Sequence, residues 1–145
     1  MTTPETRSDE LLMLQELHRS LENQLANPLQ HYDPYPKQAD FHSAGLEHPF
    51  RLFFAGNQLG KSEAGGAEVS YHLTGEYPDW WKGARFDHEV ICWVGGDTNV
   101  TTRDIIQAKL FGEPGALGTG YIPAGNIGAI TPSRNISGGY DTVQI

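Results

Sequence analysis

An α/β fold is predicted for this chain of 145 residues, with a parallel sheet core, flanking helices and a separate helix in front. An apolar strand precedes a helix twice, first at Arg51–Ala55 and again at the run "HEVICWVGG". Strands that alternate with helices pair in parallel through right-handed crossovers. A glycine-containing turn joins the first strand to its helix, and leucines at helical spacing near the N-terminus indicate the separate helix.

Residues 1–31 are predicted to form a polar arm followed by an amphipathic helix over residues 10–26. Asn27-Pro28 ends this helix, because the residue before a proline disfavours helical backbone. The stripe either packs on the same domain or docks on a neighbouring subunit. Its apolar members, spaced three or four residues apart, are Leu11, Leu14, Leu17, Leu21 and Leu25.

Three further helices are predicted within residues 32–145, which we treat as one partial domain. Glycine stops and capping side chains set their bounds. The small residues "AGGA" in the second of these helices let it lie close to a sheet. The expected helices are "KQADFHSAG" ending at Gly45, Ser62–Thr74 stopped by Gly75, and "DTNVTTRDIIQAKLFG" capped by Asp97, Thr98 or Asn99 and closed by Gly112.

Residues 112–145 are rich in glycine and proline, and the sequence leaves their order open. Two short apolar runs, "IGAIT" and "YDTVQI", are candidate strands joined by turns. We expect the second run to pair with a later strand of a complete sheet, and without that partner it would be an exposed edge.

The composition excludes several classes of protein. With 10 basic and 18 acidic side chains and a formal charge of -8, this segment is not expected to grip a long nucleic acid backbone by itself. The single Cys92 excludes an internal disulfide. The sequence contains no signal-peptide pattern and no apolar run long enough to span a membrane. The six histidines show no metal-ligand spacing.

The segment Ala55–Ser62, "AGNQLGKS", fits the pattern of a phosphate-binding loop with alanine in place of the first glycine. Backbone N–H groups of such a loop point inward at a phosphate, and the next helix directs its positive end to the same anion. Gly60 permits close approach, Lys61 places a positive charge against the β- and γ-phosphates, and Ser62 offers a hydroxyl to Mg²⁺. The predicted phosphate contacts are Ala55, Gly56, Asn57, Gln58, Leu59, Gly60, Lys61 and Ser62, with Lys61 as the catalytic residue and Ser62 as the metal ligand.

Two residues upstream of the loop are candidates for recognising a base. The amide of Gln38 carries a donor and an acceptor, so it can read the N6 and N7 edge of adenine, and Tyr35 can stack on the ring. The alternative is an exposed glutamine in a polar segment. Trp80-Trp81 favours a packed loop anchor over a stacking platform.

The sequence shows no clear acidic residue that would bind Mg²⁺ together with Ser62. Asp97, after the run "VICWVGG", is the one candidate, but we favour a helix cap there. No glutamate that would activate an attacking water can be named. A nucleotide-dependent hydrolase needs both groups, so little or no hydrolysis is expected of this chain alone.

Three stretches together resemble the N-terminal ATPase domain of the large terminase subunit of tailed double-stranded DNA phages. They are "PYPKQADFHSAG", "FFAGNQLGKSEAGGAEVSYHLTGEYPDWWKG" and "VICWVGGDTNVTTRD", and the resemblance covers Tyr32 to Leu110. It implies a phosphate-loop NTPase fold, ATP and Mg²⁺ as cofactors, and Gln38 as the adenine contact. Asn57 departs from members that carry an arginine there, so a neighbouring subunit would have to supply that charge.

The resemblance also implies a motor that packages viral DNA into procapsids. Its implied partners are the portal protein, the small terminase subunit and double-stranded DNA, in a homo-oligomeric ring in the cytoplasm of the bacterial host. It would be neither membrane-bound nor a stable virion component. Members of the family carry a later strand ending in paired acids and a nuclease domain. This sequence shows neither, so we expect an incomplete subunit that holds the ATP-binding part.

Two other functions stay open. A small-molecule kinase would share the loop but needs several arginines in a lid, and residues 112–145 hold only Arg134. A non-catalytic assembly module would keep its interface and tolerate mutation of the loop.

Overall fold

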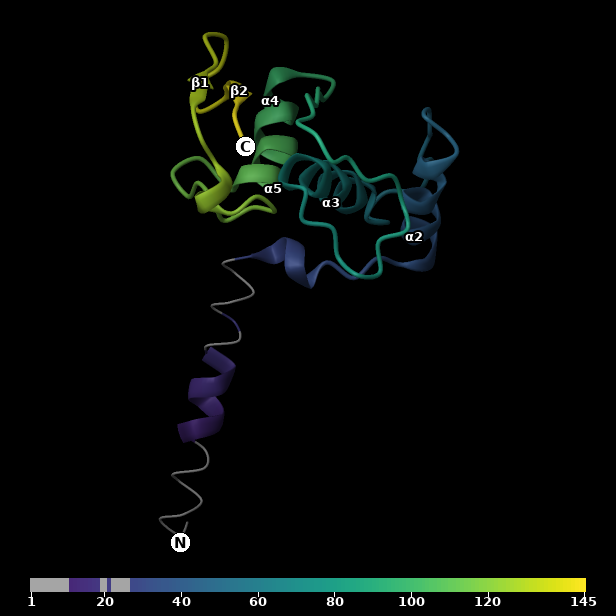
Figure 1. Ribbon diagram of the computed structural model, residues 1–145. Coiled ribbons are helices and arrows are strands. Elements are labelled where there is room, and N and C mark those ends of the chain that lie inside the picture. The colour runs from purple at the N-terminus through teal and green to yellow at the C-terminus, as the bar shows by residue number, and fades with distance from the viewer. Residues whose placement is uncertain (1–10, 19–20, 22–26) are drawn as a thin grey trace, which may run out of the picture.

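The computed structural model of the chain describes residues 11–18, 21 and 27–145 (Figure 1). Residues 11–18 are helical, as predicted, and the remainder of the predicted helix, including Leu25, lies mostly outside the described residues. The leucine stripe is exposed, with 61% of Leu14 and 57% of Leu17 accessible. The described members of the stripe therefore do not pack on the domain. Among the described residues, no helix is both long and apolar enough to cross a membrane.

Helix α3, Lys61–Thr74, is the central element of the structure. It begins after Gly60 and ends at Gly75, and both glycines adopt the left-handed conformation with φ of +72°. The stop at Gly75 follows the prediction, and the helix starts one residue earlier than predicted. Helix α2, Pro36–Ser43, begins with proline at its first turn. The 3₁₀ turn η2, Ala44–Leu46, extends it past the predicted end at Gly45.

A second long helical segment covers residues 99–111 in three consecutive pieces. They are α4, Asn99–Thr101, the π-helical η3, Thr102–Gln107, and α5, Ala108–Phe111. Of the three predicted caps, Thr98 is the one used, because its hydroxyl accepts a hydrogen bond from the Thr101 N–H at 3.1 Å. Gly112 closes the segment with φ of +97°, as predicted.

The described sheet is a two-stranded antiparallel ladder near the C-terminus. Strands β1, Ile130–Pro132, and β2, Tyr140–Val143, pair with Thr131 opposite Thr142. Both strands lie in the predicted runs, but they pair with each other. Gln107 anchors the hairpin, since its amide donates to the Gly138 carbonyl at 2.8 Å and accepts from the Tyr140 N–H at 2.9 Å. The remaining short turns are η1, Pro28–His31, and η4, Ala124–Asn126.

The predicted strands at residues 51–55 and 88–96 do not form in the described part of the chain. Both segments are irregular, and neither pairs with another strand. Without a neighbouring strand their apolar side chains face outward, with 92% of Phe54 and 96% of Trp93 exposed. The α/β class is compatible with the structure, but the parallel sheet core is not present among the described residues.

The core lies on the two sides of α3. One buried cluster joins α3 to the aromatic loop after it, and the other joins α5 to the hairpin. Gly66 allows the close contact between α3 and α5 seen in Figure 1, because a Cβ there would lie 2.9 Å from Lys109 Cγ. The small residues of α3 thus serve contact with α5 and Tyr121, where the sequence suggested contact with a sheet. The two clusters contain Leu29, Ala67, Tyr71, Trp81 and Tyr121, and Leu110, Phe111 and Ile122.

Candidate phosphate-binding site

The loop before α3 has the backbone conformation of an anion-binding turn. Gln58 has φ of +59° and Gly60 has φ of +72°. Gln58 is the one non-glycine residue with positive φ among the described residues. That conformation is unfavourable for a side-chain-bearing residue, and such positions concentrate at functional sites. Left-handed residues at alternate positions are a feature of turns whose successive N–H groups face one side and can bind an anion.

The last backbone N–H groups of this loop have no partner in the described part of the chain. Residues 57 and 58 form a hydrogen-bonded turn, but within residues 27–145 no group accepts a hydrogen bond from the backbone N–H of residues 60–63. The N-cap of α3 also lacks a side-chain hydrogen bond. The first N–H groups of a helix have no partner within the helix, so donors at a helix start are suited to phosphate oxygens.

Lys61 closes the loop on itself. Its ammonium donates to the Ala55 carbonyl at 2.9 Å and also to the Gly56 carbonyl. Both acceptors belong to the first two loop residues, so the lysine side chain folds back on the start of the loop. An entering phosphate would replace these carbonyls as the partner of the ammonium.

Ser62 and Glu63 complete the first turn of α3. Ser62 is exposed, so its hydroxyl is accessible to a ligand or metal. Glu63 accepts hydrogen bonds from Lys109 and from the Tyr121 hydroxyl. Burial by itself would raise the pKa of Glu63, but the bonds from Lys109 and Tyr121 outweigh it and lower the pKa. Glu63 is therefore ionised and neutralised by Lys109, which limits its repulsion of an anion at the loop.

Gln38 lies against the loop rather than on the surface. Only 3% of the residue is exposed. Its Oε1 accepts from the Tyr35 N–H at 2.8 Å, and its Nε2 donates to the Gly60 carbonyl at 2.8 Å. The alternative of an exposed glutamine is therefore wrong. Tyr35, by contrast, is 70% exposed and can receive a planar ring.

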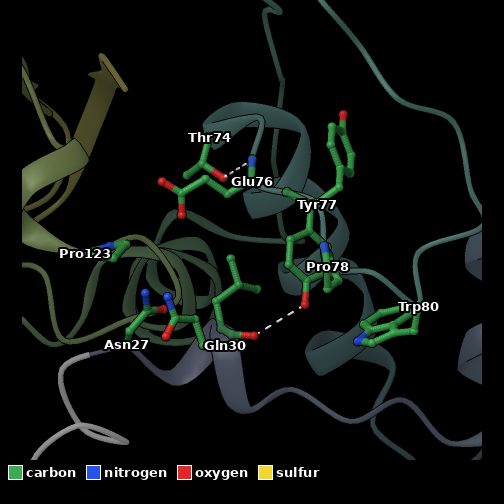
Figure 2. Close-up of a pocket in the computed structure, with 10 residues that line it drawn as sticks. Asn27, Gln30, Thr74, Glu76, Tyr77, Pro78, Trp80 and Pro123 are labelled. Carbon is green, nitrogen blue, oxygen red and sulfur yellow. Dashed lines mark hydrogen bonds between the residues drawn. The ribbon is translucent and has the colours of Figure 1, made fainter.

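Two pockets lie at opposite ends of α3. The first, of about 290 Å³, begins at Lys61 and Ser62 and runs between α3 and the helical segment 99–111 over Val69, Ile105 and Leu110. The second, of about 260 Å³, lies past the end of α3, where Tyr77, Pro78 and Trp80 face Asn27 and Gln30 (Figure 2). Only the first adjoins the loop.

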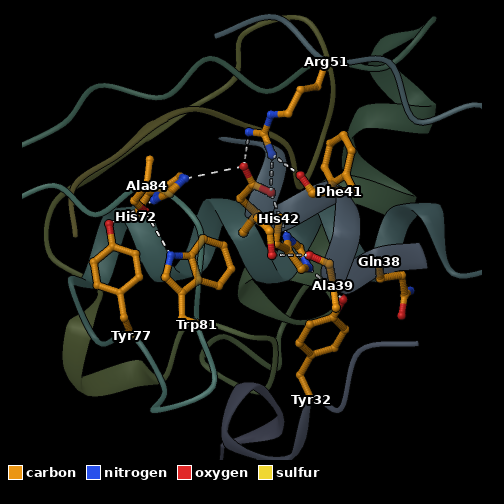
Figure 3. A network of polar contacts seen from close by, with 12 residues as sticks. Tyr32, Gln38, Ala39, Phe41, His42, Arg51, His72, Tyr77, Trp81 and Ala84 are labelled. Carbon is orange, nitrogen blue, oxygen red and sulfur yellow. Dashed lines mark hydrogen bonds and ion pairs between the residues drawn. The ribbon is translucent and has the colours of Figure 1, made fainter. Parts of the chain in front are cut away.

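A buried network of polar contacts links His42 and Arg51 through one carboxylate (Figure 3). Glu68, on α3, accepts from His42 Nδ1 at 2.7 Å and from both terminal nitrogens of Arg51. His72 Nε2 lies 3.6 Å from the same carboxylate, and the Tyr32 hydroxyl contacts His42 Nε2 at 3.0 Å. The network joins α2, the segment leading into the loop, and α3. Sequence reasoning missed it, and only the spacing of Glu68 and His72 on one helix face could have indicated part of it.

Two further residues considered from the sequence, Trp81 and Asp97, lie outside the loop. Trp81 is buried, with its indole N–H donating to the Ala84 carbonyl at 2.9 Å, in agreement with a packed loop anchor. Asp97 is exposed and does not cap the helix, because Thr98 does. Among the described residues, no cluster of three or more His, Cys, Asp or Glu could hold a metal ion.

Sequence comparison defines the class of protein: this chain is a relative of a phage terminase large subunit, which confirms the predicted resemblance to that subunit. The relative is the protein described as "Terminase, large subunit" of Salmonella phage P22. The two are 42% identical over 133 aligned positions, which cover 81% of this chain and 26% of the relative. The chain thus spans about a quarter of the length of the curated relative it matches. No family model and no solved structure matches the chain.

Proposed function

We propose that the loop Ala55–Ser62 binds the phosphates of ATP and that this chain forms the ATP-binding part of a terminase large subunit. The observation that carries the proposal is the unpaired N–H donors at residues 60–63, with the Lys61 ammonium held on the carbonyls at the start of the same loop. Donors that converge in a preformed nest, with a helix start behind them, favour a multiply charged anion. The exposed ring of Tyr35, tied to the loop through Gln38, favours a ligand with a planar base, and the family resemblance favours adenine as that base.

Mg²⁺ would enter with the nucleotide. The exposed Ser62 hydroxyl fits one position in its coordination shell, and phosphate oxygens and water would supply the others. Lys61 would bind the β- and γ-phosphates. Its positive charge would also stabilise the negative charge that develops on the phosphate during transfer.

In a longer large subunit we propose that residues 51–55 and 88–96 pair with further strands in a parallel sheet. Their exposed apolar side chains support this, since 86% of Leu52 and 90% of Ile91 face solvent here. Such a subunit would package double-stranded DNA in the cytoplasm of the bacterial host. It would work as an ATP-hydrolysing ring with the portal protein and the small terminase subunit.

The test is calorimetric titration of ATP with Mg²⁺ into the chain and into the variant Lys61→Ala. Loss of a charge-assisted contact of about 1.5–3 kcal/mol should weaken binding by about 10- to 100-fold. The matched control is Lys82→Ala, which removes the same charge from an exposed loop position. Equal affinity in the chain and in Lys61→Ala would refute the loop as the phosphate site.

A non-catalytic assembly role is supported by one observation, the exposed leucine stripe of residues 11–18. If the stripe alone carried the function, self-association would persist in Lys61→Ala and disappear in Leu14→Ser. Analytical ultracentrifugation distinguishes the two roles.

A further inference from the structure

The amide of Gln38 connects the starts of two helices. Its Oε1 accepts the Tyr35 N–H and so caps α2, while its Nε2 donates to the carbonyl of Gly60, the N-cap of α3. Gln38 and Gly60 are 22 residues apart in the chain. A single side chain therefore ties the segment that carries the exposed Tyr35 ring to the phosphate loop.

The contact at Gly60 fixes the orientation of one peptide unit. The Gly60 carbonyl accepts from Gln38 Nε2 at 2.8 Å and from the Ala64 N–H at 3.0 Å. A peptide unit is planar and trans, so its N–H points opposite to its carbonyl. Holding the Gly60 carbonyl on the Gln38 side therefore directs the Lys61 N–H away from it, toward the concave side of the loop.

The residue types at both ends of this contact fit that role. A Cβ on Gly60 would lie 2.5 Å from Gln38 Nε2, so any side chain at position 60 would displace the amide. Gln38 is buried, and a buried amide that finds both its partners is held in one rotamer. Because 3% of the residue is accessible, the amide offers almost no surface to a base in this conformation.

We propose that Gln38 is a positioning residue for phosphate binding, which orients the Gly60–Lys61 peptide through its hydrogen bond to the Gly60 carbonyl. This role rests on the proposed function of the loop. It differs from the predicted role in which the Gln38 amide hydrogen-bonds the edge of adenine. It predicts that Gln38 matters even for a ligand that has no base. The amide also keeps one N–H and one lone pair, so contact with adenine after a rearrangement is a separate question that the experiment answers.

The experiment compares tripolyphosphate, which has no base, with ATP by calorimetric titration, both with Mg²⁺. The variant Gln38→Met keeps the volume and removes both hydrogen bonds. Gln38→Asn keeps the amide on a stem that is one methylene shorter, which serves if the first variant fails to fold. Gln30→Met is the matched control, because Gln30 is an exposed glutamine remote from the loop.

The expected result is a loss of about three- to tenfold in tripolyphosphate affinity for both Gln38 variants and none for Gln30→Met. The backbone amide resonance of Lys61 should also shift in nuclear magnetic resonance spectra without ligand. If tripolyphosphate binding is unchanged while ATP binding falls, Gln38 reads only the base and the positioning role is overturned. If Lys61→Ala leaves the affinities for both ligands unchanged, the proposed function itself fails, whatever Gln38 does.

Discussion

Replacing Glu68 with glutamine should destabilise the protein more than any exposed acidic substitution. The Glu68 side chain is 9% exposed and accepts hydrogen bonds from two groups, the His42 ring and the Arg51 guanidinium. Glutamine keeps the shape but presents an NH₂ donor where the guanidinium and the rings also donate. The Arg51 side chain, 20% exposed, would then lack a counter-ion.

The size of the effect follows from the burial. Removing one partner of a fully buried ion pair costs about 3–5 kcal/mol, and the partial exposure of Arg51 reduces this to about 2–3 kcal/mol. For a chain of this length, about 2–4 °C of Tm corresponds to each kcal/mol, so Tm should fall by about 5–10 °C. Differential scanning calorimetry measures it, with Glu76→Gln as the control, because Glu76 is exposed and has no ion pair in the described part of the chain.

The same carboxylate makes stability depend on acidity. Burial alone would raise the pKa of Glu68, but its contacts with His42, His72 and Arg51 hold that pKa far below the ordinary 4.5. A lowered pKa means that the stabilisation is complete above about pH 4.5 and is lost as the pH falls below that value. The difference in Tm between the chain and Glu68→Gln should therefore narrow from pH 6 to pH 3. A change below about 2 °C at pH 6, or a difference that widens in acid, would refute the role assigned to the network.

Two further predictions concern the loop and the exposed apolar segments. Gly60→Ala places a side chain at φ of +72° and against Gln38, so it should cost about 1–2 kcal/mol in unfolding experiments and weaken ATP binding. Gly65→Ala is its control, since a Cβ there meets nothing within 4 Å and should leave binding intact. Trp93→Ser should reduce self-association measured by light scattering, because this ring is 96% exposed beside other apolar side chains. Unchanged scattering would mean that the segment 88–96 does not mediate association.

The helices were predictable from the sequence because their determinants are local. Gly75 and Gly112 end their helices through positive φ, and a threonine hydroxyl caps the segment 99–111, as capping rules require. The predicted parallel sheet does not form among the described residues, because a strand forms only where distant segments supply its hydrogen bonds. The apolar runs at 51–55 and 88–96 indicate strands but cannot show which partner satisfies them.

The loop of the candidate site was predictable from local sequence, whereas its contact with Gln38 was not. The spacing of Gly60, Lys61 and Ser62 predicts the loop, and the structure places a left-handed turn and free N–H groups there. The sequence singled out Gln38 but could not reveal that its amide binds the Gly60 carbonyl. Contacts of this kind depend on how α2 packs beside α3, which no spacing rule records. That Gln38 reads adenine stays a prediction.

The two carbonyl contacts of Lys61 bear on which anions the site can select. A cation already satisfied by the Ala55 and Gly56 oxygens gains little from exchanging them for a single weakly coordinating ion such as chloride. A triphosphate offers oxygens to the ammonium and to several N–H groups at once, so only a polydentate anion compensates for both broken contacts. The loop would then discriminate against chloride and similar ions of the solution through the two carbonyl contacts of Lys61.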